Sequence, residues 1–330
     1  MTNTPTAARK SFSPFNMLSR ELGSRGYSIA FLPLSPKYIV VTAPNGWQWV
    51  SRWAALSYPF VTVAAKQISI NKTLAYQFAD HYGVSIPKTL YLPEDADKAE
   101  AFVEQFAPVI VKPAAASGSH GLTLNITDYD ALSSAITEAR QYSQRVIVQQ
   151  QFIGSEVRIT VAEGEAVSII LRQPARVVGD GTSTVAQLIA AENEARKDLQ
   201  FEQIPYPQLT DAIIAPELMT SQYIPATGEV VELSKNSLTS GGASLYEITD
   251  DIHPSYVEIA LKLARALNPE FMVVDLMIQD YAVPQTDDNY TFIEFNTAPS
   301  LRLYCGMRTG KMFDMPAKIV DMLDKRSLRQ

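Results

Sequence analysis

Residues 271–300 read FMVVDLMIQDYAVPQTDDNYTFIEFNTAPS and hold two apolar, β-rich runs on either side of a polar turn. The runs are Phe271–Ile278 and Tyr290–Asn296, and the turn is Pro284–Asn289. Strand-forming runs separated by a short polar turn are typical of an antiparallel hairpin. We therefore expect the two runs to pair, with residue 275 opposite a residue near 295.

The predicted hairpin gathers three oxygen-bearing side chains on one patch of sheet. Pairing near residue 295 places Asp275 beside Glu294 and Asn296, and strand alternation puts these last two on one face while Phe295 points away. Carboxylate and amide oxygens suit Mg²⁺, which completes its shell with water and substrate phosphates. The sequence therefore predicts a metal site at Asp275, Glu294 and Asn296.

A solvated polar face on a half-exposed hairpin is the alternative explanation of this pattern. Asp275, however, lies inside VVDLMI, a run that reads as buried on both sides. Burying an unpaired carboxylate is costly unless a cation or hydrogen bonds compensate. The position of Asp275 therefore favours the metal, although the spacing alone does not identify an enzyme.

Composition narrows the class of protein. The 330 residues are 46% hydrophobic, which is enough for a substantial core in two or three lobes. With 35 acidic against 28 basic residues the net charge is -7, so the sequence gives no support for binding nucleic acid or an anionic membrane. No apolar run reaches the roughly 20 residues that cross a bilayer, and the N-terminus lacks the apolar segment of a secretory signal. The single cysteine, Cys305, excludes an internal disulfide and fits a reducing cytosol. We therefore expect a cytoplasmic protein whose partners are small molecules.

The order of predicted elements divides the chain into four parts. Residues 1–14 are expected to form a flexible lead, and residues 15–68 a small α/β unit rich in tryptophan. Helices alternate with short strands over residues 69–150, and residues 151–330 add a larger antiparallel sheet with helices. This order predicts a mixed α/β (α+β) fold in which a ligand is held between two lobes.

Two lysines stand where a phosphate could bind. Lys112 ends the apolar strand PVIVKP and is followed by AAASGSHGL, in which glycines let backbone N–H groups turn toward an anion. The loop lacks the GxxxxGK[ST] pattern of a P-loop, and an ordinary surface turn is the alternative. Lys72 opens a helix predicted at 71–82, where a cation conflicts with the helix dipole and a nearby anionic ligand would remove that conflict.

A third basic stretch combines two arginines with a tight turn. Arg172 and Arg176 lie beside the Gly-Asp-Gly turn at 179–181, and fixed guanidinium groups suit phosphate or carboxylate. A solvated charged face is an equally weighted alternative. The three histidines are His81, His120 and His253, and their spacing is not that of metal ligands. Only His120, in the glycine loop, could touch phosphate.

Taken together, these motifs resemble the ATP-grasp family, and within it the ligase domain of bifunctional glutathione synthetases and the ATP-grasp domain of cyanophycin synthetase. The resemblance covers roughly residues 65–305 and rests on several motifs in a compatible order. They are NK at 71–72, IVKP at 110–113 with the SGSHG loop, FIGSEVRI at 152–159, LRQPARVVGDG at 171–181, KNSLTSGG at 235–242, VVDLM at 273–277 and FIEFNTAPS at 292–300.

The resemblance implies an ATP-grasp fold, with the nucleotide held between two α+β lobes, and a role for each matched residue. Lys72 and Lys112 would contact phosphates, the hinge at 149–152 would face the adenine, and Glu156 would hold the ribose. Asp275, Glu294 and Asn296 would hold two Mg²⁺ ions, with Mn²⁺ as an alternative. The full set of implied nucleotide-binding residues is Lys72, Lys112, Ser117, Gly118, Ser119, His120, Gly121, Gln149, Gln151, Phe152, Glu156 and Asn236.

Two positions depart from the family pattern. Glutamine stands at 149 where the family commonly has glutamate, and it can accept at its carbonyl while adding a donor. Arg176 stands where the related ligases tend to have asparagine. The first departure bears on nucleotide preference.

The leading hypothesis is an ATP-dependent carboxylate-amine ligase that forms an amide through an acylphosphate and releases ADP and phosphate. Arg172, with Arg158 and Arg302 as helpers, would stabilise the developing charge. Its substrates would be a small carboxylate and an amine, such as an amino acid or short peptide, and a homo-oligomer is left open. The alternatives are an ATP-grasp phosphotransferase and a nucleotide-binding regulatory protein without turnover.

Overall fold

The computed structural model describes residues 14–52, 57–115, 120–199, 206–209, 222–234, 236–310 and 312–329. Ser117, Gly118 and Ser119 of the glycine loop, and the expected lead apart from its last residue, lie outside the described residues. The chain forms two compact units. The first comprises residues 1–61, 174–247 and 298–330, and the second comprises residues 62–173 and 248–297. The domain boundaries expected from the sequence at 68 and 150 stay a prediction.

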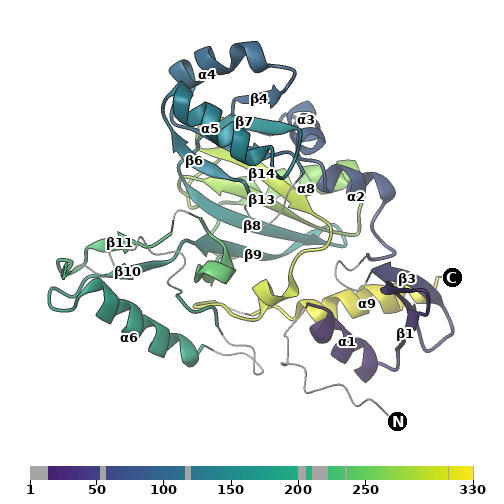
Figure 1. Ribbon diagram of the computed structural model, residues 1–330. Helices are drawn as coiled ribbons and strands as arrows, with labels where there is room; N and C mark the ends of the chain where they lie inside the picture. The colour runs from purple at the N-terminus through teal and green to yellow at the C-terminus, as the bar shows by residue number, and fades with distance from the viewer. Residues whose placement is uncertain are drawn as a thin grey trace, which may run out of the picture. The chain divides into compact units, whose positions relative to one another are not determined.

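The larger sheet of the second unit contains the predicted hairpin (Figure 1). Its strands follow the order β9 (Glu165–Gln173), β8 (Ser155–Ala162), β13 (Phe271–Ile278) and β14 (Tyr290–Asn296), and each neighbouring pair is antiparallel. Asp275 lies opposite Glu294, which confirms the expected pairing. The register then shifts, since Leu276 lies opposite Phe292 and leaves Ile293 as the extra residue of a β-bulge.

Helix α8 (Pro254–Leu267) packs against strands β8, β9 and β13 of this sheet. Its buried residues Ile259, Leu263 and Leu267 recur at four-residue spacing and form an apolar stripe. Along β8, Val157 and Ile159 are fully buried and alternate with Glu156 and Arg158. The sheet therefore has an apolar face and a second face that carries charge.

A smaller antiparallel sheet forms the other part of the second unit (Figure 1). Its strand order is β4 (Thr89–Leu92), β7 (Val146–Gln150), β5 (Val109–Pro113) and β6 (Thr123–Ile126). Helices α4 (Ala99–Phe106) and α5 (Tyr129–Ala139), with the 3₁₀ turn η1 (Ala96–Lys98), accompany it. Val109, Val111, Val146 and Val148 share a buried cluster with residues of both helices. The opposite face therefore carries the alternate residues, among them Lys112 and Gln149.

Helices α2 (Val63–Ser69) and α3 (Lys72–His81) precede the small sheet and pack on β14. The Asn71 side chain caps α3 by accepting from the Leu74 N–H at 3.2 Å. Tyr76 donates from its hydroxyl to the Ile293 carbonyl at 2.9 Å, and its ring meets Phe292 edge to face. The helix predicted at 71–82 is thus present, and it holds Lys72 beside the hairpin.

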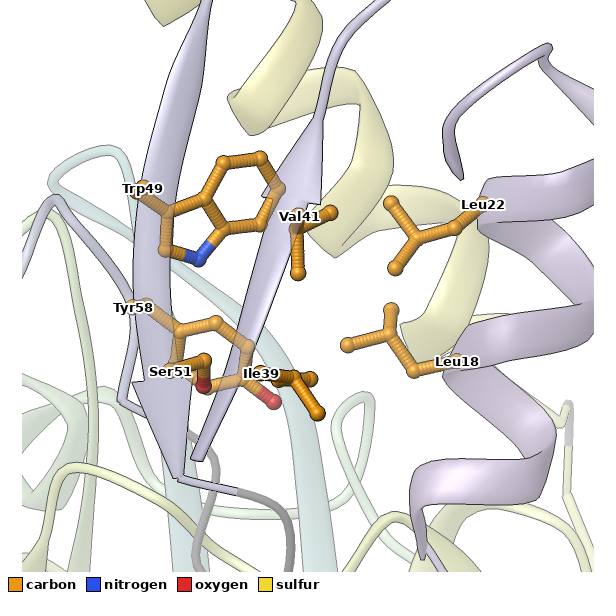
Figure 2. A pocket seen from close by; sticks show the side chains of 7 residues that line it. All are labelled: Leu18, Leu22, Ile39, Val41, Trp49, Ser51 and Tyr58. Carbon is orange, nitrogen blue, oxygen red and sulfur yellow. The ribbon is translucent and has the colours of Figure 1, made fainter. Parts of the chain in front are cut away.

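The N-terminal residues and the C-terminal helix of the first unit form a three-stranded antiparallel sheet with two helices (Figure 1). The strands are β1 (Ser28–Leu32), β2 (Ser35–Thr42) and β3 (Gln48–Arg52), and the helices are α1 (Pro14–Ser24) and α9 (Met315–Ser327). Figure 2 shows that Trp49 lines a small apolar pocket with Ile39, Val41, Leu18 and Leu22. This placement supports a packing role for Trp49.

The remainder of the first unit is built around helix α6 (Val185–Lys197) and strands β10 (Arg176–Val178) and β11 (Val230–Glu232). The short elements η3 (Thr239–Gly241), β12 (Ser244–Glu247) and η4 (Leu301–Tyr304) complete its described elements. Val177, Val185, Ile189 and Leu233 share one apolar cluster. None of the helices in the described part of the chain combines the length and apolarity needed to cross a bilayer.

Arg196 of α6 is a buried cation in the first unit, with a relative exposure of 1%. Its Nε donates to Glu192 at 2.7 Å, and its Nη1 donates to the carbonyls of Pro207 and Gly242, each at 2.7 Å. Its Nη2 donates to the Ser244 hydroxyl at 3.1 Å. These bonds tie the helix to two segments that are distant in sequence.

Candidate functional site

The register of the larger sheet brings five charged side chains onto one face. Arg172 lies opposite Glu156, Arg158 lies opposite Asp275, and Asp275 lies opposite Glu294. Directly paired residues point to the same side of a sheet, and so do residues two apart on a strand. We call this surface the polar face. It carries two arginines and three acids across four neighbouring strands, with the acids Asp275 and Glu294 side by side.

Arg158 and Asp275 form the most deeply buried ion pair of the polar face. The Arg158 Nε and Nη2 donate to the two Asp275 oxygens at 2.7 and 2.6 Å, a bidentate geometry. The side chains are 7% and 1% exposed. The buried carboxylate expected to bind a metal therefore has a cationic partner from the protein itself.

A second ion pair joins Arg172 to Glu156 across strands β9 and β8. The leading hypothesis gives charge stabilisation to Arg172, and the resemblance implies ribose binding by Glu156. The structure brings these two predicted residues into direct contact. Any ligand that engages one of them changes the environment of the other.

Glu294 is surrounded by cations and by an amide donor. Burial acts to raise the pKa of Glu294, but Lys72, the Asn296 hydrogen bond and the charges of Arg158 and Lys112 together hold it below its ordinary value. The Lys72 Nζ lies 3.6 Å from one carboxylate oxygen, and the Asn296 Nδ2 donates to the other at 2.9 Å. Glu294 therefore stays ionised and links the polar face to helix α3.

Lys112 extends from the small sheet toward the same acid. Its Nζ donates to the Tyr76 hydroxyl at 2.6 Å and lies 4.9 Å from the centre of that ring. Burial lowers the pKa of Lys112 to about 8, while the charge of Glu294 opposes this shift. The two lysines predicted to bind phosphate are thus both held close to Glu294 in one unit.

The predicted adenine hinge follows strand β7. Gln149 is 1% exposed, and its Nε2 donates to the Thr89 hydroxyl at 2.9 Å. Gln151 accepts from the Asn125 backbone N–H at 2.7 Å and donates to the Asn125 side chain at 2.9 Å, while Phe152 is half-buried. The hinge is therefore anchored by side chains at two points.

The described end of the glycine loop packs against the ring of Tyr142. His120 stacks on Tyr142 with ring centres 6.0 Å apart. Gly121 has φ of 70°, and a Cβ there would lie 2.7 Å from the Tyr142 ring. A side chain at position 121 would therefore meet both backbone strain and a steric clash.

Two predicted residues belong to the other unit. Arg302 is exposed in η4, and Asn236 accepts at its side-chain oxygen from the Leu238 N–H at 3.1 Å. Both lie in the first unit, whereas the remaining described site residues lie in the second. Their proposed roles therefore stay predictions.

Sequence reasoning missed Tyr76 and Thr89. Tyr76 follows Lys72 by four residues on a predicted helix, so the two share a helix face, and that spacing was the available signal. Thr89 had no comparable signal, because its role comes from lying opposite Gln149 in the sheet.

The oxygen donors fit a hard divalent cation in kind. Asp275, Glu294 and Asn296 supply carboxylate and amide oxygens from two paired strands. Both Asp275 oxygens accept from Arg158, but each carboxylate oxygen has further lone pairs. Across the described residues, no group of three or more His, Cys, Asp and Glu side chains is arranged to hold a metal. A cation here would thus need the asparagine and substrate oxygens as further ligands.

Comparisons with known proteins bear on the fold of the chain. Residues 82–187 match the family model described as "D-ala D-ala ligase C-terminus". The crystal structure of a bifunctional glutathione synthetase from Pasteurella multocida shares the fold with a TM-score of 0.66 at 23% identity, covering 95% of this chain and 44% of that one. The chain therefore shares the fold of this synthetase, which confirms the predicted fold class.

Sequence matches to individual proteins add detail that the fold alone does not give. The chain is 26% identical to cyanophycin synthetase from Nostoc sp. (strain PCC 7120) over 248 residues, and 24% identical to the glutathione biosynthesis bifunctional protein GshAB from Desulfotalea psychrophila over 316 residues. These matches cover 73% and 93% of this chain. The chain spans only 27% and 40% of the length of those two relatives.

Proposed function

We propose that the protein is an ATP-dependent carboxylate-amine ligase. A substrate carboxylate attacks the γ-phosphorus of ATP to give an acylphosphate and ADP, and an amine then displaces phosphate to leave an amide. One observation carries the proposal: the acids of the β13–β14 hairpin, Arg158 and the two lysines converge on one side of the second unit. Phosphoryl transfer needs mainly such positioning and charge stabilisation.

Each part of the nucleotide has a matching group in this proposal. Lys72 and Lys112 bind the phosphates, the hinge at 149–152 faces the base, and Glu156 holds the ribose. The lysines are already oriented, by Glu294 at 3.6 Å and by the Tyr76 hydroxyl at 2.6 Å. Such preorganisation lowers the ordering cost of binding. The described loop residues His120 and Gly121, with Ser117, Gly118 and Ser119, complete the proposed phosphate contacts.

Asp275, Glu294 and Asn296 would hold divalent cations, two Mg²⁺ by this proposal, that neutralise charge on the phosphates. The other site residues act on the protein's side of the reaction. Arg158 orients the Asp275 carboxylate by its two hydrogen bonds. Arg172 is held by Glu156 on the same face and supplies positive charge for the acylphosphate. Arg302 is proposed as a further helper.

Small molecules are the proposed substrates, namely an amino acid or short peptide as carboxylate and another as amine. The net charge of -7 agrees with the absence of a role for nucleic acid. A cytoplasmic location is proposed with it. The two relatives are named for cyanophycin and glutathione biosynthesis, and these products are the first to test.

An ADP-release screen tests the proposed reaction. Protein with ATP and Mg²⁺ is incubated with pairs of amino acids and short peptides, and products are identified by mass spectrometry. An amide that appears with equal amounts of ADP and phosphate supports the ligase, and Glu294→Gln serves as the inactive control. A phosphate ester as the final product, or tight ATP binding without hydrolysis under every substrate mixture, contradicts it.

A further inference from the structure

The β-bulge of the hairpin provides a backbone acceptor for Tyr76. Ile293 is the extra residue of the bulge and has no opposite residue on β13. Helix α3 packs on β14, and Tyr76 of that helix donates its only hydroxyl proton to the Ile293 carbonyl at 2.9 Å. The Tyr76 side chain is almost wholly buried, and its ring packs edge to face against Phe292. The hydroxyl is therefore fixed both in position and in orientation.

This hydroxyl can serve Lys112 only as an acceptor. Its proton goes to Ile293, and a lysine ammonium has donors alone. The bond from the Lys112 Nζ to the Tyr76 oxygen is 2.6 Å long. Among the described residues, this oxygen is the one hydrogen-bond acceptor of Lys112. One of the three N–H donors is thus used, and two remain for a ligand on a side chain that is half-buried.

The carboxylate of Glu294 is a competing partner for Lys112. Burial lowers the pKa of Lys112 while the charge of Glu294 opposes this shift, so the two groups lie within electrostatic range of each other. Within the part of the chain that the structure describes, they nevertheless form no ion pair, whereas the Lys72 Nζ lies 3.6 Å from a Glu294 oxygen. Lys112 is therefore bonded to a neutral oxygen although a carboxylate is close by.

We infer that Tyr76 is a positioning residue that keeps Lys112 off Glu294 and so leaves this carboxylate for a divalent cation. The hydroxyl oxygen gives the ammonium a neutral acceptor in place of the carboxylate. Without that oxygen, Lys112 would pair with the acid whose charge already acts on it, and a cation would have to displace the lysine. The inference rests on the proposed function, in which Glu294 holds Mg²⁺ and Lys112 binds phosphate.

Tyr76→Phe tests this inference, because it removes the oxygen but keeps the ring, whose centre lies 4.9 Å from the Lys112 Nζ. ATP is titrated into the full chain by calorimetry at a series of Mg²⁺ concentrations. The Mg²⁺ concentration that gives half-maximal ATP binding should rise about tenfold, since the new lysine–carboxylate pair must be broken before the cation binds. In a Lys112→Met background, adding Tyr76→Phe should leave that concentration unchanged, because no lysine is left to compete.

Tyr256→Phe is the matched control for the loss of a buried hydroxyl. Tyr256 is also buried, and its hydroxyl donates to a backbone carbonyl, that of Asp280, at 3.2 Å. The two variants each lose one bond of the same kind, so their thermal unfolding midpoints should shift by comparable amounts. Only Tyr76→Phe should change the Mg²⁺ dependence, which a purely structural role of Tyr76 would leave at the wild-type value.

The outcomes separate this inference from the proposed function. The same Mg²⁺ dependence in wild type and Tyr76→Phe, or an equal rise with and without Lys112, would overturn the inference. Amide formation from ATP alongside such a result would leave the proposed function standing. If ATP binds at no Mg²⁺ concentration, the proposed function is overturned and the inference with it.

Discussion

Two buried arginines, Arg158 in the second unit and Arg196 in the first, are neutralised in different ways. Arg158 faces one carboxylate, Asp275, through two hydrogen bonds on the polar face. Arg196 donates to the Pro207 and Gly242 carbonyls, to the Ser244 hydroxyl and to Glu192. The Tyr206 ring also lies 5.4 Å from the Arg196 guanidinium carbon.

Arg158 orients a carboxylate of the candidate ligand site, whereas Arg196 joins separate segments of the chain. Asp275 can exchange Arg158 for another cation, because a carboxylate keeps its charge whichever partner it has. The carbonyls around Arg196 are fixed parts of the backbone and have no such alternative within the described residues. A buried ion pair is weak evidence for stability, whereas loss of one partner is strongly destabilising. The two sites should therefore respond differently to mutation and to added metal.

The largest effect is expected for Arg196→Met. This change leaves two buried carbonyls and the Ser244 hydroxyl without their donor, and should lower the free energy of unfolding by about 3–5 kcal/mol. Denaturant titration followed by circular dichroism measures it, and added Mg²⁺ should not restore the loss. Arg265→Met is the matched control, because the Arg265 side chain is 63% exposed and its loss should change little.

Arg158→Met should cost somewhat less, about 3 kcal/mol, because it removes the donors of a single carboxylate, whereas Arg196 donates to several groups. Unlike the first variant, this one should regain stability when millimolar Mg²⁺ is added, since a cation at Asp275 replaces the lost partner. The comparison of the two buried arginines fails if Mg²⁺ stabilises both variants equally or neither.

Glu294→Gln should lower turnover by about 100-fold, which corresponds to about 2.7 kcal/mol of transition-state stabilisation, and leave the fold unchanged. The Glu294 carboxylate interacts with the charges of Lys72, Lys112 and Arg158, so its negative charge offsets theirs. Steady-state ADP release measures the effect, with the exposed Glu258→Gln as control. Activity equal to wild type would remove Glu294 from the site.

The smallest effect concerns pH. The pKa of Lys112 is lowered to about 8, so the free protein loses this charge as pH rises past that value. If only the protonated lysine binds triphosphate, ATP affinity should fall about tenfold between pH 7 and pH 9. Lys112→Arg keeps its charge and should show a flat profile by comparison, and a parallel decline in both proteins would count against the assignment.

The same shift has the opposite sign for folding. The unfolded chain holds the Lys112 proton up to its ordinary value of 10.5, whereas the folded chain releases it near pH 8. Between these values the unfolded state binds more protons, so this lysine makes the free energy of unfolding rise with pH. Denaturant titrations of wild type and Lys112→Met across that window isolate its contribution.

Sequence reasoning succeeded where partners are close along the chain. The hairpin followed from two β-rich runs and one turn, and its register brought Asp275 opposite Glu294 as expected. The helix at Lys72 followed from its composition and from a glycine after its end. Local patterns of this kind fix local geometry, so the acids of the site could be predicted together.

The unpredicted contacts come from strands that pair across long sequence separations. Arg158 and Asp275 are 117 residues apart, and only the placement of β8 beside β13 brings them together. Arg196 follows Glu192 by four residues, a spacing that usually marks an exposed helical pair. Its burial depends on the segments at 206–209 and 242–244, which no pattern in the sequence links to the helix.

Because of the bulge at Ile293, the hairpin should tolerate a change of length in its turn better than one in strand β14. Because side chains alternate along a strand, removing this one residue would turn either the aromatic side chains before it or the acid and amide after it to the wrong side. A deletion among residues 284–289 would instead shorten an exposed turn. Natural variation in hairpin length should accordingly accumulate at the turn and spare position 293.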